Sequence, residues 1–197
     1  GVIVLDICGL FFPYVIKQIC EAAKQEGYTV TLVDSGGSME VERQAVAALA
    51  ESCVDGIILS SVIPLDKTQS YAEELLEFLS AGAKKIPLVM LERDFTGCGI
   101  DSICTNTYAG ALAAMDHLIG LNCRNIAHIS APFTWEGRYS GYQDALKKSG
   151  IPFRPEYVER GDFSHESGYR CMKKILEKEI PLDGVFVAND QMAVGAL

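Results

Sequence analysis

Residues 1–6, with the sequence GVIVLD, form a continuous apolar run that ends in an aspartate. An uninterrupted apolar run of this length is typical of a strand buried on both faces of a parallel sheet. Residues 14–26 follow with a helical period of apolar positions, and Gly27 closes them. We therefore predict that the chain opens with one β-strand followed by one α-helix.

The same alternation continues through the first half of the chain. A helical period spans residues 39–51, and the capping-box spacing of Ser70 and Glu73 predicts that a third helix begins at Ser70. Strands that alternate with helices in this way indicate a doubly wound parallel α/β sheet with right-handed crossovers. The further strands of this half are predicted at residues 29–33, 56–59, 86–91 and 100–105.

The pattern starts again in the second half, which has the same α/β class. Its strands are predicted at residues 126–130, 157–160 and 184–188. Its helices are predicted at residues 108–120, 137–149, 164–179 and 191–197. The third of these helices is expected to bury Tyr169, Met172, Ile175 and Leu176, and Asp190 is expected to cap the fourth. Because only three strands are predicted here, we expect this half to be truncated and the chain to be a fragment of a larger protein.

We place the boundary between the halves near Asn106. This predicts an N-terminal subdomain of residues 1–106 and a C-terminal subdomain of residues 107–197. No linker rich in Pro, Gly or Ser marks the boundary, so we expect strands that cross over rather than a flexible tether. Doubly wound sheets bind their ligands at the carboxyl ends of their strands, which directs the search for a site to those ends.

Composition and charge exclude several classes of function. The formal net charge of -9 argues against this chain by itself gripping a phosphate backbone. The apolar runs are shorter than the roughly 18 residues of a membrane-spanning helix. Seven cysteines without a C-x-x-C pair favour reduced core thiols in a cytoplasmic protein, since an odd number would be a hazard in an oxidising compartment.

No residue pattern indicates catalysis. The three histidines, at positions 117, 128 and 165, lie in different predicted elements and lack metal-ligand spacing. The chain has no G-x-S-x-G elbow, no Walker loop and no G-x-G-x-x-G motif. We therefore expect a protein that is not an enzyme and has neither a metal nor a cofactor.

A ligand-binding set remains at and after the strand ends of both halves. Arg138 would offer five N–H donors in a rigid arrangement, and Trp135 would offer a flat apolar ring beside them. The alternative is that Arg138 only covers the surface of a helix. Carboxylates, an amide and aromatic faces suit a sugar or a nucleobase-sized ligand, while any one of the phenylalanines taken alone is better explained as core. The candidate ligand-binding residues are Asp6, Phe11, Phe12, Glu92, Arg93, Trp135, Arg138, Phe163 and Asn189.

Several segments, in combination and in order, resemble the effector-binding core of the LacI/GalR family of bacterial transcription regulators, which shares its fold with periplasmic sugar-binding proteins. The resemblance covers essentially the whole chain. The matching segments are GVIVLDICGLFFP at 1–13, VDGIIL at 54–59, PLVMLER at 87–93, NTYAGALAAMDHLI at 106–119, GRYSGYQDALKKSGI at 137–151, GDFSHESGY at 161–169 and VFVANDQMAVGAL at 185–197.

The resemblance implies a type I periplasmic-binding-protein-like fold that binds a small-molecule effector between its subdomains. It implies that Arg138 clamps the effector, that Phe163 stacks on it and that Asn189 supplies an amide. The expected effector is a sugar or sugar derivative, with a purine second. The resemblance also implies a homodimer that contacts operator DNA through a headpiece outside these residues. A periplasmic sugar receptor of a transporter is the alternative.

Two departures from the family pattern bear on the effector. Gly9 and Leu10 stand where the family usually has Asn-Pro, and Thr105 stands where it usually has Asp. Glu92 and Arg93 match a pair that is usually Asp-Arg. These changes leave the identity of the effector open.

Overall fold

The computed structural model describes residues 1–82, 84–132 and 135–197. Its contacts divide the chain into two compact units, Gly1–Thr105 and Asn106–Leu197, which we call unit 1 and unit 2. The division falls one residue before the boundary expected from the sequence.

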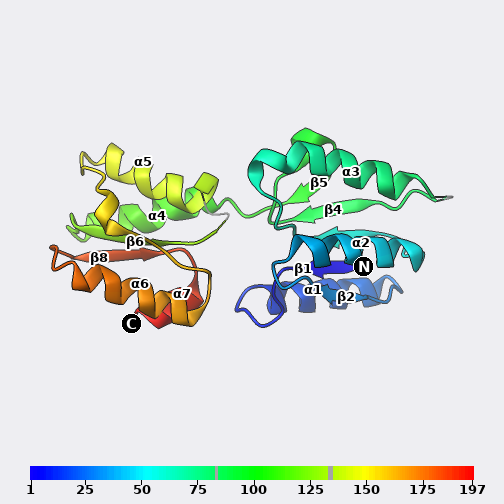
Figure 1. Ribbon diagram of the computed structural model, residues 1–197, viewed down its shortest axis with the longest axis horizontal. Coiled ribbons are helices and arrows are strands. Elements are labelled where there is room, and N and C mark those ends of the chain that lie inside the picture. Colours follow the sequence, from blue (N-terminus) through cyan, green and yellow to red (C-terminus); the bar gives the residue numbers. More distant parts are fainter. Residues whose placement is uncertain (83, 133–134) are drawn as a thin grey trace. The chain divides into compact units, whose positions relative to one another are not determined.

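Unit 1 is a parallel sheet of five strands in the order β2-β1-β3-β4-β5 (Figure 1). The strands are β1 (Val2–Val4), β2 (Leu32–Asp34), β3 (Ile57–Leu59), β4 (Leu88–Leu91) and β5 (Asp101–Ile103). The helices are α1 (Phe12–Gln25), α2 (Met39–Glu51) and α3 (Thr68–Ser80), with 3₁₀ turns η1 (Leu65–Lys67) and η2 (Thr96–Cys98). The predicted parallel α/β class is confirmed.

The first strand shows why its sequence is apolar without interruption. Val2 and Val4 pack in one cluster with residues of α1. Ile3 points to the other face of the sheet and packs beneath α2 and α3. Successive side chains of a strand alternate between faces, so a strand covered by helices on both faces needs an apolar residue at every position.

Unit 2 is a parallel sheet of three strands among the residues described, in the order β7-β6-β8. The strands are β6 (Ile126–Ser130), β7 (Val158–Arg160) and β8 (Gly184–Val187). The helices are α4 (Thr107–Gly120), α5 (Ser140–Lys148), α6 (His165–Glu177) and α7 (Asp190–Ala196). A π-helical turn, η3 (Trp135–Tyr139), precedes α5, and a 3₁₀ turn, η4 (Pro155–Tyr157), precedes β7.

The capping predicted at the starts of two helices is wrong. Helix α3 begins at Thr68, and the Ser70 hydroxyl donates to the Lys67 carbonyl at 3.1 Å instead of capping the helix. The preceding turn η1 already gives the chain a helical course, so the helix starts before its capping-box residue. At α7 the cap is Asn189 rather than Asp190, because the Asn189 side chain accepts from the Met192 amide at 3.0 Å.

The predicted inner face of α6 is partly wrong. Ile175 is buried and Met172 packs against the core, but Tyr169 and Leu176 are exposed. The buried face instead includes Gly168, where an added Cβ would lie 2.1 Å from the Met192 carbonyl oxygen. Helix α7 packs so closely at this point that only glycine fits, and this contact sets which face of α6 is buried.

The prediction that the cysteines are core thiols is also mostly wrong. All seven are free, as predicted, but only Cys171 is buried. The exposed ones are Cys8, Cys20, Cys53 and Cys104. In the part of the chain that the structure describes, we find no helix with the length and apolar character needed to cross a bilayer.

Candidate functional site

The loop after β1 is folded by two aspartates. The Asp6 carboxylate accepts from the Cys8 amide at 2.7 Å, and Asp34, at the end of β2, accepts from the Ile7 amide at 3.3 Å. The Asp6 bond lies within the loop, and the Asp34 bond ties the loop to the neighbouring strand β2. Asp6 is half-buried at the carboxyl end of the sheet of unit 1.

The two adjacent phenylalanines differ in their surroundings. Phe12 is buried in the cluster beneath α1, where it packs with Val4 and Leu91, so it serves the core. Phe11 is exposed and meets the Phe12 ring edge-to-face, with ring centroids 5.1 Å apart. Of the pair, Phe11 offers an accessible aromatic face at the strand end.

Glu92 closes the end of β4. Its amide donates to the Ile103 carbonyl at 2.8 Å, and its carboxylate accepts from the Thr105 amide at 3.2 Å and the Thr105 hydroxyl at 2.6 Å. The carboxylate therefore ties the end of β4 to the second residue after β5. Thr105 is a contact that sequence reasoning left unused. The sequence held one indication of this contact: Glu92 and Thr105 both depart from the family pattern, and their side chains are hydrogen-bonded to each other.

Arg93 joins two strand ends. Its Nη2 donates to the Ile63 carbonyl at 2.6 Å, which links the end of β4 to the loop after β3. The side chain is half-buried. A guanidinium that donates to a backbone carbonyl in this way has a fixed direction.

Arg138 lies on the π-helical turn η3, not on the first turn of an α-helix as predicted. The residues that follow it explain the local structure. Gly141 approaches α4 so closely that an added Cβ would lie 2.7 Å from the Ala111 Cβ, and the Tyr142 hydroxyl donates to the Ile126 carbonyl at 2.8 Å. The Gly-Tyr pair of the R-x-x-G-Y motif thus fixes the start of α5, and Arg138 lies on the π-helical turn just before it.

His128 supports this turn from β6. Its ring is buried and stacks on Tyr142 and Phe186 with centroids 5.0 and 4.9 Å apart, and it lies 5.8 Å from the Tyr139 ring. Nδ1 is 2.8 Å from the Phe186 carbonyl, which only accepts, so this nitrogen carries the proton. Burial lowers the pKa of His128 to about 4, although the bond to Phe186 opposes the shift. The imidazole of His128 is therefore neutral at pH 7.

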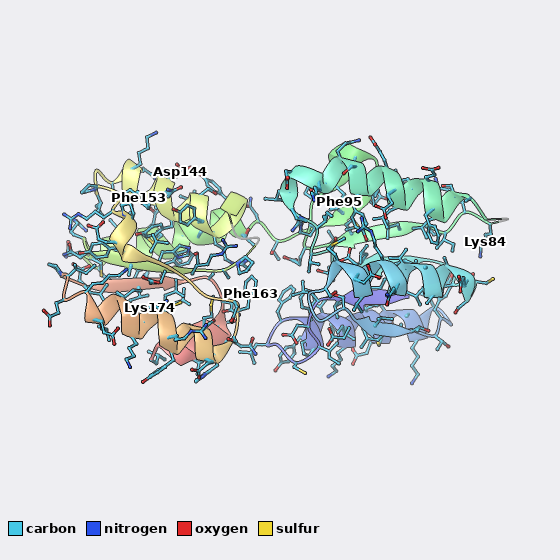
Figure 2. All side chains as sticks on the ribbon, viewed as in Figure 1. Lys84, Phe95, Asp144, Phe153, Phe163 and Lys174 are labelled. Carbon is cyan, nitrogen blue, oxygen red and sulfur yellow. The ribbon has the colours of Figure 1, made fainter. Side chains whose placement is uncertain are left out.

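Phe163 and Asn189 are brought together after β7 and β8. The Asn189 Nδ2 donates to the Phe163 carbonyl at 3.0 Å while its Oδ1 caps α7. Phe163 lies in the loop between β7 and α6 (Figure 2). Before it, the Asp162 carboxylate accepts from the Ser164 hydroxyl and amide, and these bonds, with one from Ser167, hold the Asp162 pKa below its usual range.

Glu92 and Phe163 also share an uncommon backbone conformation. Their φ angles are +60° and +74°. The other non-glycine residues with positive φ among those described, Cys53, Asn122 and Glu179, each come directly after a helix cap, where left-handed geometry is ordinary. Glu92 and Phe163 follow strands instead, and uncommon conformations of this kind cluster at ligand sites.

Each unit therefore carries part of the predicted set at its strand ends or in the segments that follow them. Unit 1 contributes Asp6, Phe11, Glu92 and Arg93, and unit 2 contributes Arg138, Phe163 and Asn189. The Trp135 side chain lies outside the described parts of the structure. The residues described contain no group of three or more His, Cys, Asp or Glu side chains able to hold a metal ion.

Two parallel α/β units of this kind define a type I periplasmic-binding-protein-like fold. The chain belongs to the family of periplasmic binding proteins and sugar-binding domains of the LacI family, whose model matches residues 1–197. The family resemblance expected from the sequence is confirmed.

Individual relatives agree with this assignment. The chain is 32% identical over 195 residues to the HTH-type transcriptional repressor PurR of Photorhabdus laumondii, covering 95% of this chain and 54% of the relative. The chain thus spans about half the length of the curated relatives it matches.

Solved structures share the fold. A putative LacI-family regulator from Sanguibacter keddieii is 26% identical with a TM-score of 0.81, and the match covers 100% of this chain and 68% of that one. A LacI-family regulator from Enterococcus faecium with bound ribose is 24% identical with a TM-score of 0.78, over 100% and 68% of the two chains.

Proposed function

We propose that this chain is the effector-sensing part of a LacI-type transcriptional regulator and that it binds a sugar-like molecule with the strand ends of both units. The observation that carries the proposal is the gathering of the predicted polar and aromatic residues after the carboxyl ends of parallel strands in each unit, where ligands of such sheets bind. Family membership adds independent support.

The chemistry of these residues suits a polyhydroxylated ring. Arg138 would donate in a bidentate manner to ring hydroxyls, Asn189 and Asp6 would bond further hydroxyls, and the Phe163 face would cover apolar C–H edges. Each charge-assisted hydrogen bond contributes roughly 1.5 to 3 kcal/mol. Three or four of them, after ordering costs, correspond to about micromolar affinity.

The rest of the proposal concerns the parent protein. We propose that it acts in the cytoplasm as a homodimer and contacts operator DNA through a separate headpiece, since the net charge of -9 makes this chain itself a poor partner for DNA. The effector would bias the relative orientation of the two units. A differential affinity of about 1 to 3 kcal/mol between two orientations suffices for such coupling.

A thermal-shift assay tests the choice of effector. The panel contains D-ribose, cellobiose, fructose 1-phosphate, adenine and hypoxanthine. The sugars are chosen because regulators of the same fold have been solved with ribose, cellobiose and fructose 1-phosphate, and the purines because relatives carry the name PurR. We expect a sugar to raise the melting temperature in a concentration-dependent way. A shift with purines only would overturn the sugar assignment, and no shift with any compound would count against both.

The family description also names periplasmic binding proteins, which keeps a transporter-associated sugar receptor as the second candidate. The residues before Gly1 in the parent gene distinguish the two. A helix-turn-helix of about 60 residues indicates a regulator, whereas a charged and then apolar leader indicates a receptor. All the relatives and structures named above are regulators, which favours the first.

A further inference from the structure

Glu42 is a fully buried acidic residue on the inner face of α2. Its side chain has no exposed surface, and the neighbouring inner positions hold Ala45, Val46 and Leu49. A carboxylate in such a position costs several kcal/mol unless donors surround it. An apolar residue would satisfy the helix at this position, so the acid serves something other than packing.

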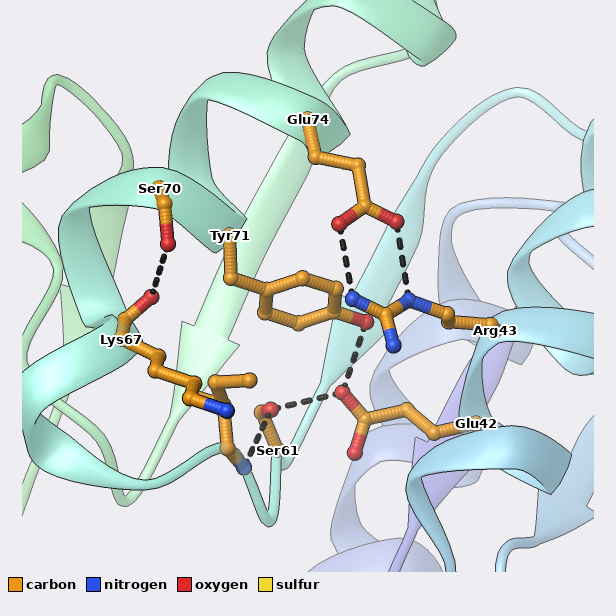
Figure 3. Close-up of polar contacts among 8 residues, drawn as sticks. Glu42, Arg43, Ser61, Lys67, Ser70, Tyr71 and Glu74 are labelled. Atoms are coloured by element: carbon orange, nitrogen blue, oxygen red, sulfur yellow. Dashed lines mark hydrogen bonds and ion pairs between the residues drawn. The ribbon is translucent and has the colours of Figure 1, made fainter.

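Three donors from two other segments converge on this carboxylate, as Figure 3 shows for two of them. One oxygen accepts from the Ser61 hydroxyl at 2.6 Å and from the Tyr71 hydroxyl at 2.9 Å. The other accepts from the Val62 amide at 3.0 Å. Burial, and then the Glu42 charge, raise the pKa of Tyr71 far above its ordinary value, so its hydroxyl stays protonated as a donor.

The bonds continue from Glu42 to a candidate effector residue. The Ser61 hydroxyl, while donating to Glu42, accepts from the Ile63 amide at 3.1 Å. The Ile63 carbonyl in turn accepts from Arg93 Nη2 at 2.6 Å. Glu42, Ser61, Ile63 and Arg93 therefore form one chain of hydrogen bonds from α2, through the loop after β3, to the end of β4.

An ion pair covers the same network from outside. Arg43 and Glu74 make a bidentate pair with both distances at 2.8 Å, and the guanidinium lies 5.2 Å above the Tyr71 ring (Figure 3). Glu42 is thus held between the loop after β3 and helix α3, and the bonds through Ser61 and Ile63 link it to Arg93.

We infer that Glu42 is a positioning residue for effector recognition: it fixes residues 61–63 and through them sets the direction of Arg93. The inference rests on the proposed function for its effect on affinity. We call the fixing of residues 61–63 by Glu42 the clamp. The clamp is a property of unit 1 and can be measured without an effector.

Ser61→Ala tests the clamp in the full-length protein, because it removes the bond to Glu42 and the acceptor of the Ile63 amide together. Amide hydrogen exchange followed by NMR should show exchange at Ile63 accelerated about tenfold or more. Ser61→Thr keeps the hydroxyl and should restore protection. Unchanged exchange at Ile63 in Ser61→Ala would overturn the clamp.

Tyr71→Phe provides a second variant that keeps the ring and removes one donor to Glu42. Its matched control is Tyr157→Phe in unit 2, which also removes one buried hydroxyl donor, here to the Pro181 carbonyl at 2.6 Å. Titration calorimetry with D-ribose, or with whichever panel compound shifts the wild type, should show affinity reduced about fivefold to tenfold in Tyr71→Phe. Tyr157→Phe should bind as the wild type does.

The outcomes separate this inference from the proposed function. Equal losses of affinity in Tyr71→Phe and Tyr157→Phe would mean that Glu42 acts through general stability and would overturn the positioning role. Faster exchange at Ile63 with unchanged affinity would overturn the link to Arg93. A wild type that binds no panel compound would count against the proposed function, while the exchange measurement would still decide the clamp.

Discussion

The two units differ in one of the means that hold their strand ends. In unit 1 a buried carboxylate, Glu42, accepts directional hydrogen bonds from the loop after β3 and from Tyr71 of α3. In unit 2 the neutral ring of His128 stacks between aromatic rings beneath the turn that carries Arg138, and glycines let helices meet at short range. Directional bonds fix a loop at particular atoms, whereas stacking and close packing fix whole elements. The two units should therefore fail under different perturbations.

The largest effect is expected from removing the carboxylate in unit 1. Glu42→Ala would leave the Ser61 and Tyr71 hydroxyls and the Val62 amide without their buried acceptor, and we expect a loss of about 3 to 5 kcal/mol in the free energy of unfolding. Urea denaturation measures it. Glu40→Ala, at an exposed position of the same helix, is the control and should change stability by less than about 0.5 kcal/mol. Equal effects of the two variants would contradict the account.

The ring stack of unit 2 should instead respond to pH. The pKa of His128 is about 4 in the folded state and about 6.5 when unfolded. As pH falls from about 6.5 to 4, the unfolded chain takes up a proton that the folded chain refuses, so stability falls by about 3 kcal/mol over that window and no further below it. His128 Nε2, with no hydrogen-bond partner among the described residues, cannot offset this cost.

Urea denaturation across that pH window, compared with His128→Phe, isolates the contribution of this residue. In His128→Phe, the free energy of unfolding should depend much less on pH across this window than it does in the wild type. The control is His117→Gln at an exposed position, which should leave the pH dependence of the free energy of unfolding as it is in the wild type. If His128→Phe shows the same pH dependence of the free energy of unfolding as the wild type, other groups cause that dependence.

A steric change should also affect unit 2. Gly168→Ala would drive α6 away from the Met192 carbonyl, and we expect a loss of about 2 to 3 kcal/mol. Gly110→Ala is the matched control, because this helical glycine of α4 has open space around it, and that change should stabilise the chain by about 0.5 to 1 kcal/mol. Denaturation curves that move in the same direction for both variants would argue against close packing as the cause.

The smallest effect should come from the outer ion pair of unit 1. The Arg43 and Glu74 side chains are both about half exposed, so a double-mutant cycle with Arg43→Ala and Glu74→Ala should give a coupling energy of about 0.5 kcal/mol that weakens in 1 M salt. A salt-independent coupling as large as the effect of Glu42→Ala would show that the network depends on its outer layer instead of on the buried acid.

Much of the fold follows from local sequence. Helix α2 and strand β6 have the bounds predicted for them, because an amphipathic period and an apolar run at a sheet centre are local signals. The start of α3 and the cap of α7 depend on how a preceding turn or a neighbouring side chain is used. The buried face of α6 depends on contact with α7, which no periodicity reveals.

The candidate site divides in the same way. Strand ends could be located from the sequence, and most of the named residues lie at them or in the loops that follow. The placement of Phe12 in the core, the contact of Glu92 with Thr105 and the burial of Glu42 depend on which segments meet in space. Glu42 lies at an inner position of the helical period of α2, but a charged side chain on a helix is usually solvated, so its residue type hid its burial.

Arg138 carries the central claim, that the strand ends bind a small effector, and titration calorimetry on Arg138→Ala tests it most directly. With the panel compound that binds the wild type, we expect the dissociation constant to rise at least about 30-fold, corresponding to the loss of about 2 kcal/mol from a charge-assisted bidentate contact. Arg154→Ala, next to Tyr157 in the same unit, should bind as the wild type does. Unchanged affinity in a folded Arg138→Ala protein would contradict the account.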